Sequence, residues 1–422
     1  MKNASLFIAV LWVSGALLTA CTGVSGVEEE GSDSKYGPQY STQEHQQRTF
    51  DAMWKHITEN YIYIDTADVN WDSLHTKYSA QIGEGLSDEQ FTELINELTD
   101  ELPAGAMSYQ PRQDRIEADT GVFSASTYEG IGAFVGFQAE DEPHIVILGV
   151  IKGSPAEGAG IKPHDSIYQI DGNPVLLEEG INVVERIRGP AGSSVSVDVQ
   201  TPGSPLRTIE VTRAELISAG ALESHVINDS SYGYILFPPI GYEDLLKDVL
   251  ASMQSFTTDR ELKGLIIDLR VSGSGQGWPL EELLTLFHDG PVGEFYNSTQ
   301  AEQSVSVEGQ DYYTSQSVPL IILVGSHTTG SPEIFAASLQ AGSRAVIIGD
   351  ITPGAIETTS SFYLPDGSRV FVETTSFRLP NGTELGSTCV QPDIRLDAGW
   401  DDILPTNDPV LDQAIETLGA EK

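Results

Sequence analysis

Cysteine and lysine are both scarce in this chain of 422 residues. The two cysteines, Cys21 and Cys389, cannot form the disulfide framework that stabilises small secreted domains, and we interpret Cys389 as a small buried apolar side chain. The sequence contains no CxxC pair and no HExxH motif, so we expect neither a metal site nor a cofactor. No lysine occurs between Lys263 and Lys422, which leaves this stretch without a lysine to act as a general base.

Acidic residues outnumber basic ones, with 62 Asp and Glu against 22 Lys and Arg, which gives a net charge of -40. Such a field repels nucleic acid and anionic membrane surfaces, so we expect no nucleic-acid partner. We interpret the excess of acidic residues as a source of solubility. The hydrophobic fraction of 40% is ordinary for a globular protein, and the length is enough for two or three domains.

The first residues read MKNASLFIAVLWVSGALLTAC, in which Lys2 precedes an apolar stretch too short to span a bilayer comfortably. The final Leu-Thr-Ala-Cys resembles a bacterial lipobox. This resemblance implies that residues 1–20 are a lipoprotein signal peptide and that Cys21 is lipidated, whereas a plain secretory signal or a short anchor is the alternative. Residues 21–45, rich in Gly, Ser and Glu, then form a flexible tether. We therefore expect an extracytoplasmic protein, lipid-anchored to a bacterial membrane in the periplasm or at the cell surface.

Residues 46–118 have a helical pattern. In RTFDAMWKHITENYIYI the apolar residues recur at intervals of three and four, which predicts one buried helix face. In SDEQFTELINELTDEL, Ser87 stands at the helix N-cap position, and acidic residues fill the first turn. We assign both helices to core packing.

Residues 125–215 contain short β-rich runs separated by Gly, Pro and Asp turns. The segments YEGIGAFVGF, VIKGSPAEGAGIKPHDSIYQIDG and VVERIRGPAGSSVSVDV resemble a PDZ domain, a β-barrel-like fold. The resemblance implies that an extended peptide adds a strand to an exposed sheet edge while a glycine-rich loop holds its terminal carboxylate. The residues that match this loop are Gly130, Ile131, Gly132 and Ala133. A PDZ fold that only packs against its neighbour is the alternative.

One position of this region departs from the PDZ pattern. His164 stands where the family usually has a glycine, in the turn before Asp165. A side chain there is expected to adjust the turn without abolishing the fold.

Residues 225–405 alternate strand and helix patterns, from LKGLIIDLR through PLEELLTLF, VPLIILV and PEIFAASLQAG to RAVIIG. This order predicts a largely parallel sheet with right-handed crossovers. Sites in such sheets lie just past the carboxyl ends of the strands, and GSHTTGSPEI, residues 325–334, occupies one of these places. The three regions together predict an α+β multidomain protein.

The order of these regions, over roughly residues 46–400, resembles the carboxy-terminal processing peptidases, also called tail-specific proteases. Further segments that carry the resemblance are GSPAEGAGIKPHD, GLIIDLR, LPDGS and VQPDI. The resemblance implies a serine peptidase core with crotonase/ClpP-like βαβ units, acting on protein C-terminal tails. It also implies a nucleophilic serine assisted by a lysine in one branch or by a histidine-containing group in the other.

The positions that match the family's catalytic residues carry no reactive side chain here. The nucleophile position is Gly330, and the lysine position, in the turn Thr-Pro-Gly-Ala, is Ala355. The supporting glutamine position falls on Thr359, and the histidine position of the other branch falls on Ala106. The strand-end DLR-x-N-x-G-G, which helps to shape the oxyanion region, reads DLRVSGSG over residues 268–275.

Two interpretations remain open at this point. Ser331, one position past the expected nucleophile, either caps the helix that follows or is a displaced nucleophile with His327 as its base. Ser272, Ser274 and Ser326 are further serines near the strand ends. The first interpretation gives a catalytically lost peptidase that still binds extended or C-terminal tails. The second gives an active serine endopeptidase that processes C-termini.

Overall fold

The computed structural model describes residues 41–113, 127–139, 142–217, 221–227, 231–275, 278–300 and 302–420. The predicted signal peptide, Cys21 and most of the predicted tether lie outside these residues. Among the described residues, no helix combines the length and the apolar content that a membrane crossing requires.

The N-terminal helices form as the apolar spacing predicts. They are α1 (Thr42–Asn60), α2 (Trp71–Ile82) and α3 (Asp88–Glu101). Ser87 is the N-cap of α3, and its hydroxyl accepts from the amide of Gln90 at 3.2 Å while the Gln90 side chain accepts from the amide of Ser87 at 3.0 Å. The tether was expected to reach residue 45, whereas α1 already begins at Thr42.

An antiparallel sheet supports these helices and was not predicted from the sequence. Its strands are β1 (Ser108–Gln110), β13 (Gly290–Asn297), β14 (Glu302–Val307), β17 (Thr358–Tyr363) and β18 (Arg369–Arg378). The long strand β18 packs against α1, and Val370 and Val372 complete one core cluster with the apolar faces of the three helices. Segments that are far apart in the sequence therefore share this core.

The PDZ region is a separate antiparallel unit with its own apolar cluster. The sheet order β3-β4-β5-β7-β8 leaves β3 at one edge of the described sheet. Its main strands are β3 (Ala133–Gln138), β4 (His144–Val150), β5 (Ser166–Ile170), β7 (Ser194–Gln200) and β8 (Arg207–Thr212). Two further short strands, β2 (Thr127–Gly130) and β9 (Ala214–Ile217), pair with each other. The remaining small elements are β6 (Asn173–Pro174), α5 (Pro155–Gly158), a 3-10 helix (Leu177–Val183) and α6 (Val184–Ile187).

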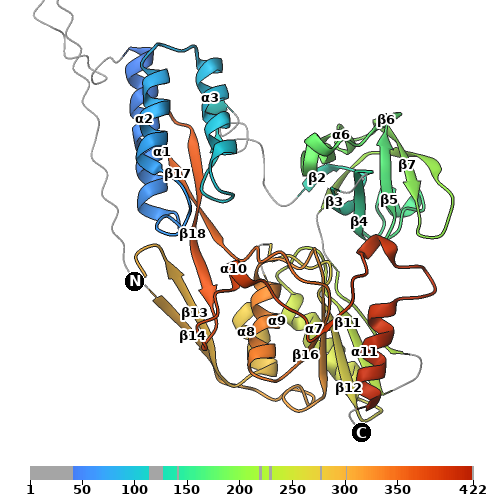
Figure 1. The fold of residues 1–422 in the computed structure, drawn as a ribbon. Helices are drawn as coiled ribbons and strands as arrows, with labels where there is room; N and C mark the ends of the chain where they lie inside the picture. The colour runs from blue at the N-terminus through green and yellow to red at the C-terminus, as the bar shows by residue number, and fades with distance from the viewer. Residues whose placement is uncertain are drawn as a thin grey trace, which may run out of the picture. The chain divides into compact units, whose positions relative to one another are not determined.

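The remaining core is the α/β unit that the sequence predicts, and its strands run parallel from β11 to β19. In order across the sheet they are β10 (Glu223–Val226), β11 (Tyr232–Leu236), β12 (Gly264–Asp268), β15 (Leu320–Val324), β16 (Val346–Gly349) and β19 (Ile394–Arg395). The covering helices are α7 (Leu245–Thr257), α8 (Leu280–Phe287), α9 (Ser331–Ala341) and α11 (Pro409–Ala420), and α8 and α9 pack on each other (Figure 1). Every residue of β12 and β15 is buried, which explains their unbroken apolar runs.

Candidate functional site

The turn between β15 and α9 keeps an unusual backbone at the predicted nucleophile position. Gly330 is the N-cap of α9 and has φ 72° and ψ -128°. Positive φ is costly for a residue with a side chain, and a strand-to-helix turn that presents a nucleophile holds it in a strained conformation of this kind. Ser331 is the first helical residue, so its interpretation as the N-cap is wrong by one position.

The structure brings Gly330 and Ala355 together, as their matching to the family's serine and lysine requires. A Cβ atom at residue 330 would lie 3.8 Å from the Ala355 carbonyl oxygen. The Glu333 carboxylate joins the two turns, because it accepts from the amide of Gly330 at 3.0 Å and from the amide of Gly354 at 2.7 Å. The backbone positions of Gly330 and Ala355 are therefore close together, but the site has neither the serine hydroxyl nor the lysine amine.

Glu333 has a structural task in this arrangement. Its side chain is fully buried, and burial raises the pKa of Glu333 against the opposing effect of hydrogen bonds from Thr352 and from nearby amides. The fold thus has a buried acidic residue beside Ala355, the position that the family resemblance gives to a neutral lysine.

Ala106, the histidine position of the other branch, lies in a different part of the protein. It is fully buried within the cluster formed by the N-terminal helices and β18. Its amide donates to Pro103 at 3.1 Å, and the neighbouring Gly105 carbonyl accepts from Glu373 at 3.0 Å. Thr359, the glutamine position, is exposed in β17 and pairs with Glu373 of β18. Neither residue supplies a proton acceptor to Gly330.

Ser331 and His327 do not form a dyad. The His327 ring lies against β3 of the PDZ region, since a Cβ at Gly136 would be only 2.6 Å from its Cε1 atom. His327 Nε2 is buried without a hydrogen-bond partner in the described structure, and burial lowers the pKa of His327. Ser331 lines a pocket of about 990 Å³, and the backbone amide of Ser331 donates to Ser274 Oγ at 2.6 Å.

The turn between β15 and α9 is also hydrogen-bonded to the loop that follows β12. The Thr328 hydroxyl donates to the Leu269 carbonyl at 2.8 Å, and the Thr329 amide donates to the Ser272 carbonyl at 3.0 Å. Ser274 belongs to the same loop. The sequence placed it near a strand end among several serines, but gave no reason to connect it with Gly330.

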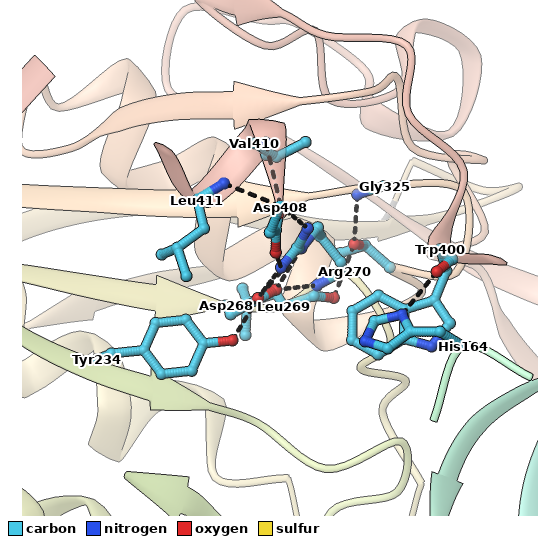
Figure 2. A network of polar contacts seen from close by, with 11 residues as sticks. His164, Tyr234, Asp268, Leu269, Arg270, Gly325, Trp400, Asp408, Val410 and Leu411 are labelled. Carbon is cyan, nitrogen blue, oxygen red and sulfur yellow. Dashed lines mark hydrogen bonds and ion pairs between the residues drawn. The ribbon is translucent and has the colours of Figure 1, made fainter. Parts of the chain in front are cut away.

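A buried charged network lies behind this loop, and sequence patterns did not reveal it. Arg270 is flanked by two carboxylates, at 2.6 Å from Asp268 and 2.7 Å from Asp408, and the Tyr234 hydroxyl donates to Asp268 at 2.7 Å (Figure 2). Asp408 stands at the start of α11, so Arg270 connects β12 to the C-terminal segment. Burial acts to raise the pKa of Asp408, but the hydrogen bonds and charge of Arg270 outweigh it and lower this pKa.

The same C-terminal segment contacts the PDZ region through Trp400. Its ring lies 5.2 Å from the Arg270 guanidinium, its Nε1 donates to the Ile147 carbonyl at 3.0 Å, and its carbonyl is 2.6 Å from His164 Nδ1. His164 has φ 74°, the left-handed conformation that explains why a glycine was expected there. Its ring packs on Trp400 with 4.0 Å between ring centroids (Figure 2).

The predicted carboxylate loop connects β2 to β3. Gly132 has φ 87°, and a Cβ on it would lie 2.3 Å from Ser154 Cβ, so only glycine fits without movement. The carbonyls of Ile131 and Gly132 accept from Ala156 at 2.8 Å and from Ile151 at 2.9 Å. These contacts fix the loop at the start of the edge strand β3.

Cys389 is the one cysteine among the described residues. Cys389 is half-buried and has φ 56°, and a Cβ at Gly354 would lie 3.0 Å from its Sγ. It is therefore less buried than the sequence predicted.

In the described part of the chain, no group of three His, Cys, Asp or Glu side chains is arranged to hold a metal ion.

Comparison with family models divides the chain in the same order. Residues 231–396 match Peptidase family S41, residues 146–201 match the PDZ domain, and residues 42–100 match the Tricorn protease C1 domain.

Curated relatives are processing proteases. The chain is 27% identical over 280 residues to carboxy-terminal processing protease CtpB of Bacillus subtilis, with 64% of this chain and 56% of that protein covered. It is 31% identical over 272 residues to a carboxyl-terminal-processing protease of Picosynechococcus, with 61% and 63% covered. The chain thus spans less than two thirds of the length of these two relatives.

A solved structure confirms the fold. The photosystem II D1 C-terminal processing protease superposes with a TM-score of 0.64 at 22% identity, over 89% of this chain and 97% of that one.

Proposed function

Because this chain carries a peptidase family S41 domain together with PDZ and Tricorn C1 domains, as a relative of the carboxyl-terminal processing proteases, we propose that it binds protein tails without cleaving them. One observation supports this most strongly. Gly330 and Ala355 meet in space at the positions matched to the nucleophile and its base, and neither carries a functional group. A hydroxyl without a base is a poor nucleophile, and here both are missing.

The binding function rests on the edge of the PDZ sheet. β3 is an edge strand of the described sheet, and the loop of Gly130, Ile131, Gly132 and Ala133 lies at its start. Strand addition uses backbone hydrogen bonds, which accept many sequences, while the loop selects a free carboxylate. The proposed ligands are therefore extended or C-terminal tails of proteins.

The proposed location follows from the N-terminal sequence. Cleavage before Cys21 and lipidation of its thiol would anchor the protein outside the cytoplasm, with residues 21–41 as a spacer ahead of α1. The tails available to it would then belong to envelope or secreted proteins.

An active endopeptidase that uses Ser331 is the second candidate, and one observation favours it. Ser331 lines the ≈ 990 Å³ pocket beside α8 and is partly exposed. Labelling of Ser331 by a fluorophosphonate would support this candidate and contradict the first.

Tail binding is tested with a fluorescent peptide that ends in apolar residues. We expect measurable binding of the free-acid peptide to the full chain, and roughly 10- to 100-fold weaker binding of the same peptide with an amidated C-terminus, since a charge-assisted hydrogen bond is worth about 1.5–3 kcal/mol. Fluorescence anisotropy measures both dissociation constants. Equal affinity for the two peptides would contradict carboxylate capture by the loop.

Two glycines provide the matched control. Gly132→Ala and Gly153→Ala each place a side chain at positive φ, but the Cβ meets Ser154 only at residue 132 and has nothing within 4 Å at residue 153. Binding should be lost in Gly132→Ala and retained in Gly153→Ala. Loss in both variants would indicate general damage to the PDZ fold.

A further inference from the structure

Ser274 lies where a side chain on residue 330 would be. A Cβ atom built on Gly330 would be 2.0 Å from Ser274 Oγ, which is too close for two real atoms, and 3.2 Å from Ser274 Cβ, which is a tight contact. The two positions also form a reciprocal pair in the sequence. The serine expected at residue 330 is a glycine, and the first glycine of the expected strand-end pair is Ser274. The Ser274 side chain therefore fills the space that a serine side chain at residue 330 would take.

The Ser274 hydroxyl also occupies a backbone donor. The amide of Ser331, in the first turn of α9, donates to Ser274 Oγ at 2.6 Å. Amides at the start of a helix are well placed to stabilise an oxyanion or a carboxylate. Here the Ser331 amide, next to Gly330, already has the Ser274 hydroxyl as its hydrogen-bond acceptor.

The position of Ser274 is fixed on both sides. The preceding Gly273 amide donates to the Pro239 carbonyl at 3.0 Å, and Gly273 bridges to Ile240. On the other side, a Cβ on Gly241 would lie 3.0 Å from the Ser274 carbonyl oxygen. Ser274 is thus held by the 239–241 segment.

We propose that Ser274 is an internal plug, which fills the vacated nucleophile position and satisfies the amide of Ser331. The proposal deepens the proposed function, on which it rests, because it accounts for the absence of a reactive centre at the start of α9. Ser274 is not itself placed to react. Within the described residues, no histidine, lysine or carboxylate is hydrogen-bonded to its hydroxyl, so nothing would remove its proton.

The plug predicts an energetic coupling between residues 274 and 330. Gly330→Ser should lower the melting temperature by several degrees, because the new side chain overlaps Ser274 and the backbone has positive φ. Adding Ser274→Gly should recover a large part of this loss, although Ser274→Gly alone gives no gain. Gly325→Ser is the control in the same turn, since its Cβ would come no closer than 3.7 Å to Arg270. Additive effects of the two substitutions would overturn the proposal.

Chemical labelling gives a second readout. In the full chain carrying Gly330→Ser and Ala355→Lys, a fluorophosphonate should fail to label position 330, and adding Ser274→Gly should permit labelling. Labelling that is equal with and without Ser274 would overturn the plug, as would labelling of Ser274 in the unaltered chain. The melting cycle uses no tail and no cleavage, so its failure is distinguishable from failure of the tail-binding proposal.

Discussion

Arg270→Ala is expected to lower the free energy of unfolding by about 3–5 kcal/mol, as the loss of one partner from a buried ion pair does. The substitution leaves Asp268, which is fully buried, with the Tyr234 hydroxyl as its remaining side-chain partner. It also releases Asp408, and with it the start of α11. Because whole proteins are typically stable by about 5–15 kcal/mol, a loss of this size removes a large part of the total.

Arg395→Ala provides the matched control for Arg270→Ala. Arg395 also forms a carboxylate pair, with Asp350 at 3.1 Å, but its side chain is 57% exposed. Exposed pairs contribute about 0–1 kcal/mol, so this variant should unfold in urea close to the unaltered protein. Urea midpoints that are equal for the two variants would contradict a structural role for the Arg270 network.

The same network makes part of the stability dependent on pH. Since the pKa of Asp408 is lowered in the folded protein, its ionised form stabilises the fold at pH values above its ordinary pKa. This contribution disappears as the pH falls through the lowered pKa. The protein should therefore lose stability in acid, and Asp408→Asn should flatten that part of the profile.

Trp400→Ala is expected to cost about 3–5 kcal/mol, the usual range for removing a large buried aromatic side chain. The indole is 5% exposed and packs with Val146 of the PDZ region and Val271 of the core. Its loss should therefore weaken the contact between these two regions. Limited proteolysis should then cut the segment near residue 400 faster, while thermal unfolding shifts to lower temperature.

Trp400→Phe separates packing from hydrogen bonding in this prediction. Phenylalanine keeps an aromatic ring but cannot donate to the Ile147 carbonyl, as Trp400 Nε1 does at 3.0 Å. The expected loss is about 0.5–1.5 kcal/mol, the net contribution of one hydrogen bond, because the Ile147 carbonyl still accepts from the His164 amide at 3.0 Å. This loss is smaller than that of alanine. A Trp400→Ala protein as stable as the unaltered one would contradict this account of the PDZ contact.

Local patterns predicted much of the fold and part of the site. The parallel core sheet followed from unbroken apolar strands alternating with helices, and Ser87 was identified as a cap at the start of a helix with acidic residues in its first turn. Gly330 and Ala355 were paired by resemblance, and the structure brings them together.

The remainder depends on contacts between distant segments. The antiparallel sheet of β1, β13, β14, β17 and β18 joins segments that are distant in the sequence, since β1 pairs Ser108 with Phe371 of β18. The same holds for Arg270, whose partner Asp408 lies 138 residues away, and for Ser274, whose hydroxyl meets the Ser331 amide across 57 residues. Neither pair has a periodicity that a sequence pattern could reveal.

Cleavage of an unstructured protein with an apolar C-terminus tests the central claim most directly. The full chain and its Ser331→Ala variant are incubated with this protein, and mass spectrometry follows the products while anisotropy follows binding. We predict tail binding by both chains and no cleavage by either, because Gly330 and Ala355 supply neither a nucleophile nor a base. Cleavage by the unaltered chain that disappears in Ser331→Ala would contradict the account and identify Ser331 as a displaced nucleophile.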